Sequence, residues 1–134
     1  MTPEESKAQV VDAARDLAHT VGIDGMTASF QSESCNDQGE APFRGSVHMS
    51  YPVAEDLQKA EAERAAMIGK LQAHGWSTDS EFRTHGAALH KDNVTAVVYP
   101  QNVTSQARII TIYGECRDVT TTKSGDAEDI ALNE

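Results

Sequence analysis

Two stretches of the chain show the 3.6-residue apolar period of an amphipathic helix. In the first, over residues 3–21, Thr2 and Glu5 have the spacing of a capping box, and Gly22 suits the left-handed end of a helix. The second runs over about residues 54–73 and is followed by a His-Gly pair. The pattern therefore predicts two helices, each with one apolar side.

Alternating apolar and polar residues, typical of half-buried strands, begin at Met26 and resume at Val47. The intervening segment is polar and contains Gly and Pro, which favours a hairpin with a long loop. Pro52 ends the second of these strands. Further strands are predicted after the second helix, over residues 76–82, 87–91, 94–99 and 107–115.

The predicted element order is therefore α-β-β-α-β-β-β-β. Strands joined in succession by short turns pair antiparallel, and two helices with one apolar side each cover a single face of the sheet. We expect an α+β two-layer sandwich with about five to six strands, formed by residues 1–117. Residues 118–134 are acidic and rich in Thr, Ser and Gly, a composition that predicts a disordered tail.

The net charge of the chain limits the classes of partner that it is expected to bind. The formal net charge is −10 and no basic run occurs, so we expect no nucleic-acid binding and no docking on anionic lipid headgroups. No segment approaches the ~20 apolar residues of a membrane span. The first residues also lack a signal peptide, which leaves two alternatives: a cytosolic protein, or an exported one whose export segment was removed.

Catalytic and metal-binding patterns do not stand out. The histidines show no i, i+4 pair, neither cysteine belongs to a CxxC motif, and no serine lies in a Gly-x-Ser-x-Gly elbow. We therefore expect no enzyme activity, no metal site and no cofactor. His85 and His90 lie near one predicted hairpin, and an uncharacterised hydrolase that uses one of them with a nearby acid remains an alternative.

The two cysteines lie at predicted strand ends: Cys35 follows the first strand and Cys116 closes the last. If these strands are neighbours, or meet at one edge, their Cα atoms come within the ~4.4–6.8 Å that a disulfide needs. Such a bond persists only in an oxidising compartment. The spacing alone leaves open two unrelated thiols in a cytosolic protein.

Two further features have both a structural and a functional interpretation. The loop that begins at Asn36 gathers oxygen donors around Gly39, as hard cations prefer, but its spacing differs from an EF-hand, and turn formation is the favoured interpretation. Trp76, after the second helix, either lines a groove or fills the edge of the core, and its large apolar area favours the core.

Three segments resemble small actinobacterial lipoproteins of the LppA-like kind. The run Cys35 to Gly45 is similar to their loop after the first strand, in which a cysteine precedes an acidic Gly-Glu-x-Pro-aromatic-x-Gly segment. Tyr113 to Arg117 resembles their last strand with its second cysteine, and Leu71 to Trp76 resembles their helix-Gly-Trp transition. In order, the resemblance covers the chain apart from a short lead and the tail.

The resemblance implies export, a lipid-modified cysteine ahead of the domain and a Cys35–Cys116 disulfide, but no assigned activity. The leading hypothesis is thus a non-catalytic domain on the outer face of the membrane, attached only through a lipid anchor. We expect it to bind an envelope protein or a small ligand through a sheet edge or the disulfide-held loop, with candidate residues Asn36, Asp37, Gln38, Glu40, Arg44 and Arg117. The other alternative is a small-molecule or cation carrier with a pocket near Trp76.

Overall fold

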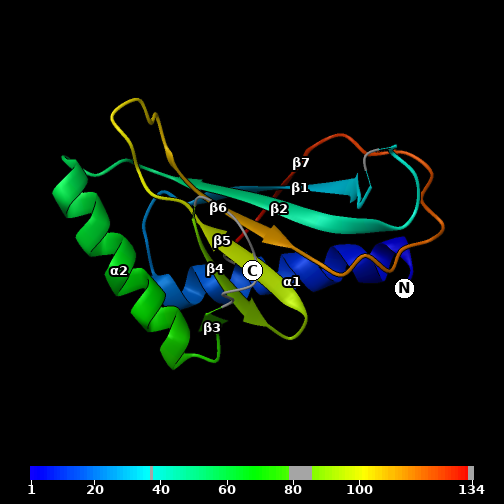
Figure 1. Ribbon diagram of the computed structural model, residues 1–134, viewed down its shortest axis with the longest axis horizontal. Helices are drawn as coiled ribbons and strands as arrows, with labels where there is room; N and C mark the ends of the chain where they lie inside the picture. Colours follow the sequence, from blue (N-terminus) through cyan, green and yellow to red (C-terminus); the bar gives the residue numbers. More distant parts are fainter. Residues whose placement is uncertain (37, 79–85, 133–134) are drawn as a thin grey trace.

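The computed structural model describes residues 1–36, 38–78 and 86–132 (Figure 1). Two helices and seven strands follow one another in this part of the chain. The helices are α1 (Pro3–Val21) and α2 (Leu57–Ala73). The strands are β1 (Thr27–Ser34), β2 (Phe43–Tyr51), β3 (Ser77–Thr78), β4 (Ala87–Lys91), β5 (Val94–Val98), β6 (Arg108–Tyr113) and β7 (Glu128–Ile130).

All strands belong to one sheet with the order β3-β4-β5-β6-β2-β1-β7, in which every neighbouring pair is antiparallel. This confirms the expected α+β class. The strand predicted over residues 76–82 is present as β3, although residues 79–82 lie outside the described part. The strand number exceeds the expected five to six because β7, which the sequence did not predict, extends the sheet beyond β1.

The ends of the helices follow the capping pattern of the sequence. In α1 the Oγ1 of Thr2 accepts a hydrogen bond from the Glu5 amide (3.1 Å), and the Glu5 carboxylate accepts one from the Thr2 amide (2.8 Å). Gly22 ends α1 with a φ of 62°, a left-handed value that glycine adopts without strain. Helix α2 begins later than residue 54, because the Asp56 side chain caps it by accepting from the Lys59 amide (2.7 Å).

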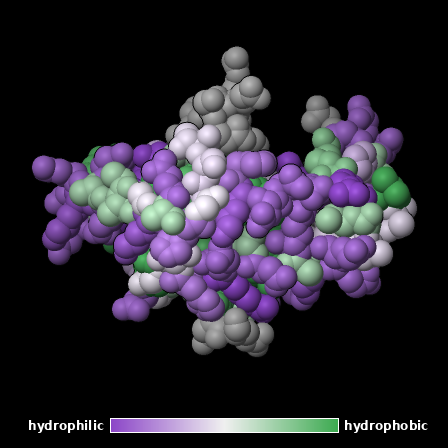
Figure 2. All heavy atoms as spheres, turned by 90° about the horizontal axis from the view of Figure 1, so that it is seen from below, coloured by the Kyte–Doolittle hydropathy of each residue, from purple (hydrophilic) through white to green (hydrophobic). Residues whose placement is uncertain are grey.

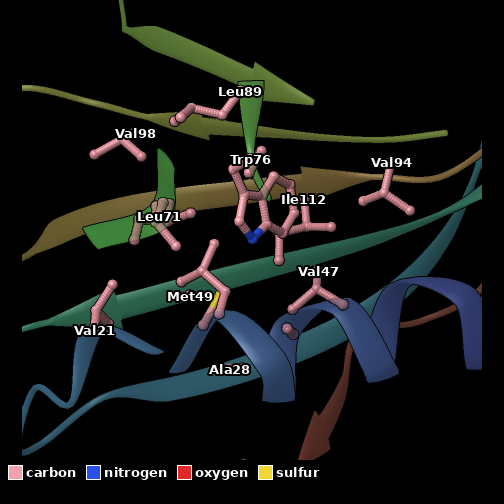
Figure 3. Packing of buried hydrophobic residues seen from close by; sticks show 14 of the residues in the cluster. Val21, Ala28, Val47, Met49, Leu71, Trp76, Leu89, Val94, Val98 and Ile112 are labelled. Carbon is pink, nitrogen blue, oxygen red and sulfur yellow. The ribbon is translucent and has the colours of Figure 1, made fainter. Parts of the chain in front are cut away.

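Both helices contribute to one apolar core with the sheet and therefore cover the same face. Figure 3 shows part of this core beside α1. Leu17 of α1 and Leu71 of α2 are fully buried there, together with alternate residues of the central strands such as Met49 and Ile112. Trp76, directly after α2, belongs to this cluster and is 2% exposed, as the core interpretation predicts. Its buried indole Nε1 has no hydrogen-bond partner among the described residues.

Helix α1 crosses the sheet at unusually short range above two glycines. A methyl group added at Gly45 of β2 would lie 2.7 Å from the Ser6 carbonyl oxygen of α1 and 2.8 Å from Val10 Cγ2. One added at Gly114 would lie 2.9 Å from Val10 Cγ1. The helix therefore packs backbone against backbone at this point, and any larger residue would push the two layers apart.

The segment expected to be a disordered tail pairs with the sheet in part. Phe43 and Asp118 form an isolated antiparallel bridge, and β7 pairs with β1, with Ile130 opposite Ala28. Composition misses such pairing because one half-buried aliphatic residue and backbone hydrogen bonds suffice for a short edge strand. The division between residues 117 and 118 as a domain boundary stays a prediction.

The outer surface of the molecule is mostly hydrophilic. Figure 2 shows a face on which polar residues dominate and apolar residues lie in small, separate groups. The large hydrophobic residues that are clearly exposed in the described part are Val53, Leu57, Val103 and Val119. Scattered apolar residues of this kind are normal on a protein surface.

Candidate functional site

The disulfide predicted between Cys35 and Cys116 is present and joins the ends of two strands that are not neighbours. The two Cα atoms are 6.1 Å apart, across a sequence separation of 81 residues. Strand β2 lies between β1 and β6, so the bond closes over its first residue, Phe43. The chain on both sides of Phe43 is held as well, by hydrogen bonds between Cys35 N and Pro42 O (3.0 Å) and between Phe43 N and Asp118 O (2.7 Å).

The loop after Cys35 is organised by Asn36. The Asn36 Oδ1 accepts hydrogen bonds from the amides of Gln38 (3.0 Å) and Glu40 (3.1 Å), and its Nδ2 donates to the Ala41 carbonyl (3.3 Å). These contacts fit a turn-forming role. Gln38 and Glu40 are exposed, whereas Asp37 lies outside the described residues. No group of three or more potential metal ligands occurs in the described part of the chain.

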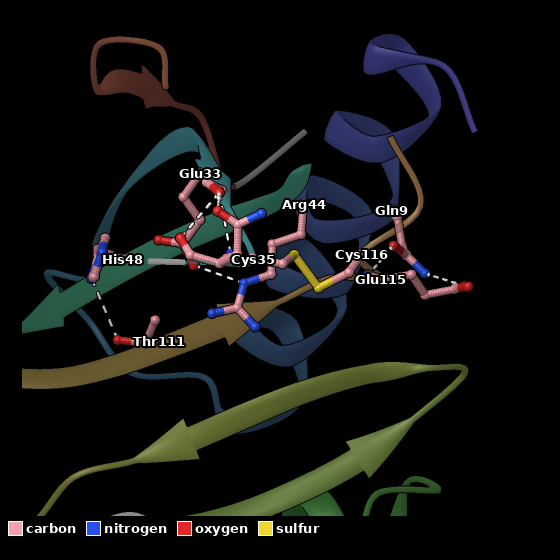
Figure 4. A network of polar contacts seen from close by, with 10 residues as sticks. Gln9, Glu33, Cys35, Arg44, His48, Thr111, Glu115 and Cys116 are labelled. Atoms are coloured by element: carbon pink, nitrogen blue, oxygen red, sulfur yellow. Dashed lines mark hydrogen bonds and ion pairs between the residues drawn. A yellow bond between two sulfur atoms is a disulfide. The ribbon is translucent and has the colours of Figure 1, made fainter. Parts of the chain in front are cut away.

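The other two candidates point to different neighbours. Arg44 donates from Nε to Glu33 Oε1 (2.8 Å; Figure 4). Its guanidinium also lies 4.4 Å from the centre of the Tyr113 ring. Arg117 is exposed and donates to Glu115 (3.1 Å). The Arg117 hydrogen bond, with one from Gln9, holds the pKa of Glu115 below its usual value. The six predicted residues thus do not form one convergent cluster among those described.

Asp118 fixes the chain just beyond the disulfide. Its carboxylate is buried and accepts hydrogen bonds from the amides of Thr120 (3.0 Å) and Thr121 (3.2 Å) and from both threonine hydroxyls. Burial alone would raise the pKa of Asp118, but these hydrogen bonds outweigh it and hold the pKa below the ordinary value of 3.8. Asp118 is therefore a structural anchor that the charge pattern of the tail did not reveal.

Replacing Asp118 with alanine is expected to lower the free energy of unfolding by about 1–3 kcal/mol, because the amides and hydroxyls of Thr120 and Thr121 lose their charged acceptor. Since the folded pKa is depressed, the Asp118 carboxylate stabilises the fold above its unfolded pKa, and this contribution is lost as pH falls through the folded pKa. Urea melts between pH 7 and pH 3 should thus show a smaller acid loss for Asp118→Asn than for the wild type. Asp126→Asn, at an exposed position, is the control, and equal acid losses in both variants would contradict the assignment.

The face of the sheet opposite the helices carries polar and aromatic side chains. Strand alternation puts Arg44 and His48 of β2 on this open face, with Thr111 and Tyr113 of β6 beside them. The Thr111 hydroxyl lies 3.4 Å from His48 Nδ1 (Figure 4). Burial raises the pKa of Tyr113, and the charge of Tyr99 and a hydrogen bond with it add to the rise. The two phenols, contributed by β6 and by the residue after β5, therefore meet on the open face.

A hollow of about 580 Å³ lies on this open face, and we call it the tyrosine hollow. Its volume falls within the range of about 300–1,000 Å³ that small-molecule sites occupy. Among the described residues its lining contains hydroxyl, amide and imidazole groups but no carboxylate: His48, Tyr99, Pro100, Asn102, Ser105, Ala107, Ile109, Thr111 and Tyr113. Such a lining suits a partly apolar ligand with hydrogen-bonding groups.

The remaining alternatives are a carrier pocket near Trp76 and a hydrolase that uses His85 or His90. Trp76 lines neither the tyrosine hollow nor the second hollow, at the β1–β7 edge, so a carrier pocket near Trp76 does not fit these surfaces. His85 lies outside the described residues, and His90 is exposed at the β3–β4 edge. Within the described ranges, no helix has the length and apolar character needed to cross a membrane.

Comparison with known proteins identifies relatives along nearly the whole chain. The family model described as "Putative lipoprotein LppJ" matches residues 2–133. Proteins with that same description from two strains of Mycobacterium tuberculosis and from Mycobacterium bovis are each 33% identical over 123 residues. The match covers 90% of this chain but 63% of each relative, less than two thirds of its length.

No solved structure matches the chain. The resemblance to small actinobacterial lipoproteins, inferred from the two cysteine-containing segments and the helix-Gly-Trp transition, is confirmed, with LppJ as the matching family. With a family model that spans residues 2–133, the chain belongs to the LppJ lipoprotein family.

Proposed function

We propose that this domain is a non-catalytic ligand-binding module on the outer face of the membrane, attached through a lipid ahead of residue 1. The observation that carries the proposal is the tyrosine hollow, on a sheet face that neither helix covers. The name of the LppJ relatives supports the lipid anchor, and the disulfide supports an oxidising compartment.

The lining of the tyrosine hollow favours a neutral or anionic small molecule. Its polar groups are uncharged hydroxyls and amides, with the His48 imidazole at one side. Just beyond it, the Arg44 guanidinium lies against the Tyr113 ring and supplies positive charge. Phenol rings provide flat apolar contact at low entropic cost, and their hydroxyls supply donors. A partly apolar molecule with carbonyl or hydroxyl groups fits this combination.

The position of the N-terminus is compatible with a tether. The amino group of Met1 lies 3.4 Å from the Arg117 carbonyl oxygen, at the disulfide end of the domain. The loop from Pro100 to Ala107, which borders the tyrosine hollow, joins β5 to β6 at the opposite end (Figure 1). A lipid-bearing segment ahead of Met1 would therefore leave this side of the hollow pointing away from the membrane.

Mass spectrometry of the full-length protein, purified from the envelope of an actinobacterial host in mild detergent, tests both parts of the proposal. Under denaturing conditions the mass should include covalent acyl chains. Under native conditions an additional non-covalent mass should accompany the wild-type domain and disappear in Ala107→Arg, because Ala107 lines the tyrosine hollow but not the second hollow.

The matched control is Val103→Arg, which introduces the same side chain and charge at a position that is 86% exposed and does not line the hollow. This control should keep the extra mass. Repeated failure to observe any non-covalent mass, or an equal loss in both variants, would contradict the ligand-binding proposal. An absence of acyl mass would contradict the tether.

A further inference from the structure

The C-terminal segment occupies a groove that has the features of a peptide-binding site. Strand β7 pairs antiparallel with the outer edge of β1, with Glu128 opposite Phe30 and Ile130 opposite Ala28. In this way a short piece of the chain supplies the last strand of the sheet (Figure 1). Addition of an extended segment to an exposed sheet edge is a general mode of peptide recognition, with affinity from the backbone and specificity from alternate side chains.

Helix α1 forms the other wall of the groove and supplies two cationic side chains. Lys7 Nζ lies 2.5 Å from Glu128 Oε1 and 5.4 Å from the centre of the Phe30 ring. Eight residues later in α1, Arg15 Nε donates a hydrogen bond to the Ala131 carbonyl (2.8 Å). The eight-residue interval on the helix spans about 12 Å, close to the roughly 10 Å between residues 128 and 131 in extended chain.

The side chains of the bound segment define what the groove accepts. Glu128 meets Lys7, while Ile130 and Leu132 pack against the apolar core. Asp129 lies opposite Ser29, on the other side of the strand. The groove therefore reads an acidic residue followed by aliphatic residues two and four positions later, in an extended conformation.

The contacts that hold this segment are largely solvent-exposed. Besides the pairing of β7, Gly125 donates to the Ser32 carbonyl (3.2 Å) and accepts from Gln31 Nε2 (2.8 Å). The Lys7–Glu128 pair is solvent-exposed, with 39% and 57% of the side-chain surfaces accessible, and exposed pairs contribute about 0–1 kcal/mol. Beyond the Asp118 anchor, residues 119–127 are exposed apart from half-buried Thr121. Few buried contacts and a polar connecting segment are the marks of a region that opens at low cost.

The groove has more room than its occupant uses. A hollow of about 1090 Å³ adjoins it, lined in part by Ile23 and Met26 before β1 and by Ile130 and Leu132 of the tail. Once β7 leaves, β1 becomes an edge strand with unpaired backbone groups, which invites another strand. The net charge of −10 makes two copies of the chain repel each other, so a segment of a different protein is the favoured occupant.

We propose that the groove between α1 and the edge of β1 binds an extended segment of a partner protein with the pattern acidic-x-aliphatic-x-aliphatic. The chain's own residues 128–132 fill it in the absence of that partner. The hollow beside the groove shares His48 and Ile109 with the tyrosine hollow, but the contacts of residues 128–132 with α1 and β1 involve neither residue. The two proposals are therefore tested separately through Lys7, Ile130 and Leu132, which do not line the tyrosine hollow.

The test uses the full-length domain and a fluorescent peptide with the sequence of residues 124–132. In a variant with Ile130→Ser and Leu132→Ser, the chain's own segment competes less, and the peptide should bind at least tenfold more tightly than it binds the wild type. A peptide that carries the same two serines should not bind. The emission of Trp76, the single tryptophan, and the melting curve establish that each variant is folded.

The matched control replaces two exposed valines, Val53→Ser and Val103→Ser, and should bind the peptide no better than the wild type. In the variant with Ile130→Ser and Leu132→Ser, which we call the open variant, the additional change Lys7→Glu should weaken peptide binding about two- to fivefold. A peptide with Glu128→Lys should restore the affinity. If the open variant is unfolded, Ile130→Ala alone provides the same comparison, with a smaller expected gain in peptide affinity.

A folded open variant that fails to bind the peptide, or binds the serine-substituted peptide equally well, would overturn the proposal. Native mass spectra of the wild type that show concentration-dependent dimers, abolished by Ile130→Ser and Leu132→Ser, would overturn the choice of a foreign segment in favour of a second copy.

Discussion

Replacing Cys35 and Cys116 together with serine is expected to lower the free energy of unfolding by about 4–5 kcal/mol. The bond closes a loop with a sequence separation of 81 residues, and chain entropy in the unfolded state sets this magnitude. The loss approaches the whole stability of many small domains, so the variant should be partly unfolded at 37 °C. Urea unfolding of the oxidised wild type and the double-serine variant, followed by Trp76 emission, measures the difference.

The control for this result is the redox state of the wild type. Alkylation of the denatured, unreduced protein should add no label, and the intact mass should remain that of a monomer. Wild-type protein treated with a reductant should then unfold at the same urea concentration as the double-serine variant. Two added labels without reduction would contradict the disulfide, and with it the support for an extracytoplasmic location.

The second large effect is expected at Gly45, where Gly45→Ala should cost about 2–3 kcal/mol. The new methyl group would meet the Ser6 carbonyl, which belongs to the backbone of α1 and cannot rotate away, so the helix must shift. Chemical unfolding of the variant measures the cost.

Gly69 in α2 provides a matched control for Gly45. It is exposed, and an added methyl group would meet nothing within 4 Å. Gly69→Ala should therefore stabilise the domain by about 0.5–1 kcal/mol through helix propensity. Opposite signs for the same substitution would establish the close helix–sheet approach, whereas similar effects at the two positions would contradict it.

Local features of the chain were predictable because local physics determines them. The capping box at Thr2 and Glu5, the left-handed Gly22 and the alternation in β2 and β6 each depend on residues close together in the sequence. The positions of the cysteines at strand ends allowed a disulfide and the resemblance implied it, and the structure has it between β1 and β6 across β2.

Features that depend on distant pairing were not predictable. Alternation places Arg44 and Tyr113 on polar sides of their strands, but only the register of β2 against β6 brings them together. The tyrosine hollow depends on the same register, and none of its lining residues is among the six candidate residues, whose role in binding stays a prediction. Strand β7 was not predicted because its pairing depends on residues distant in the sequence: Glu128 contacts Lys7 and lies opposite Phe30.

The central position of β2 has a consequence for how the chain acquires its structure. One neighbour of β2 is β1, which directly precedes it in the sequence. The other neighbour is β6, so Ser46 pairs with Tyr113, far along the chain. Contacts between residues that are far apart in the sequence slow folding. Because β6 lies between β5 and β2, the first hundred residues cannot form the complete sheet. A nascent chain can therefore complete this sheet only after β6 has been made. That order of assembly is compatible with the export that we propose, in which the Cys35–Cys116 bond would form outside the membrane once both cysteines are present.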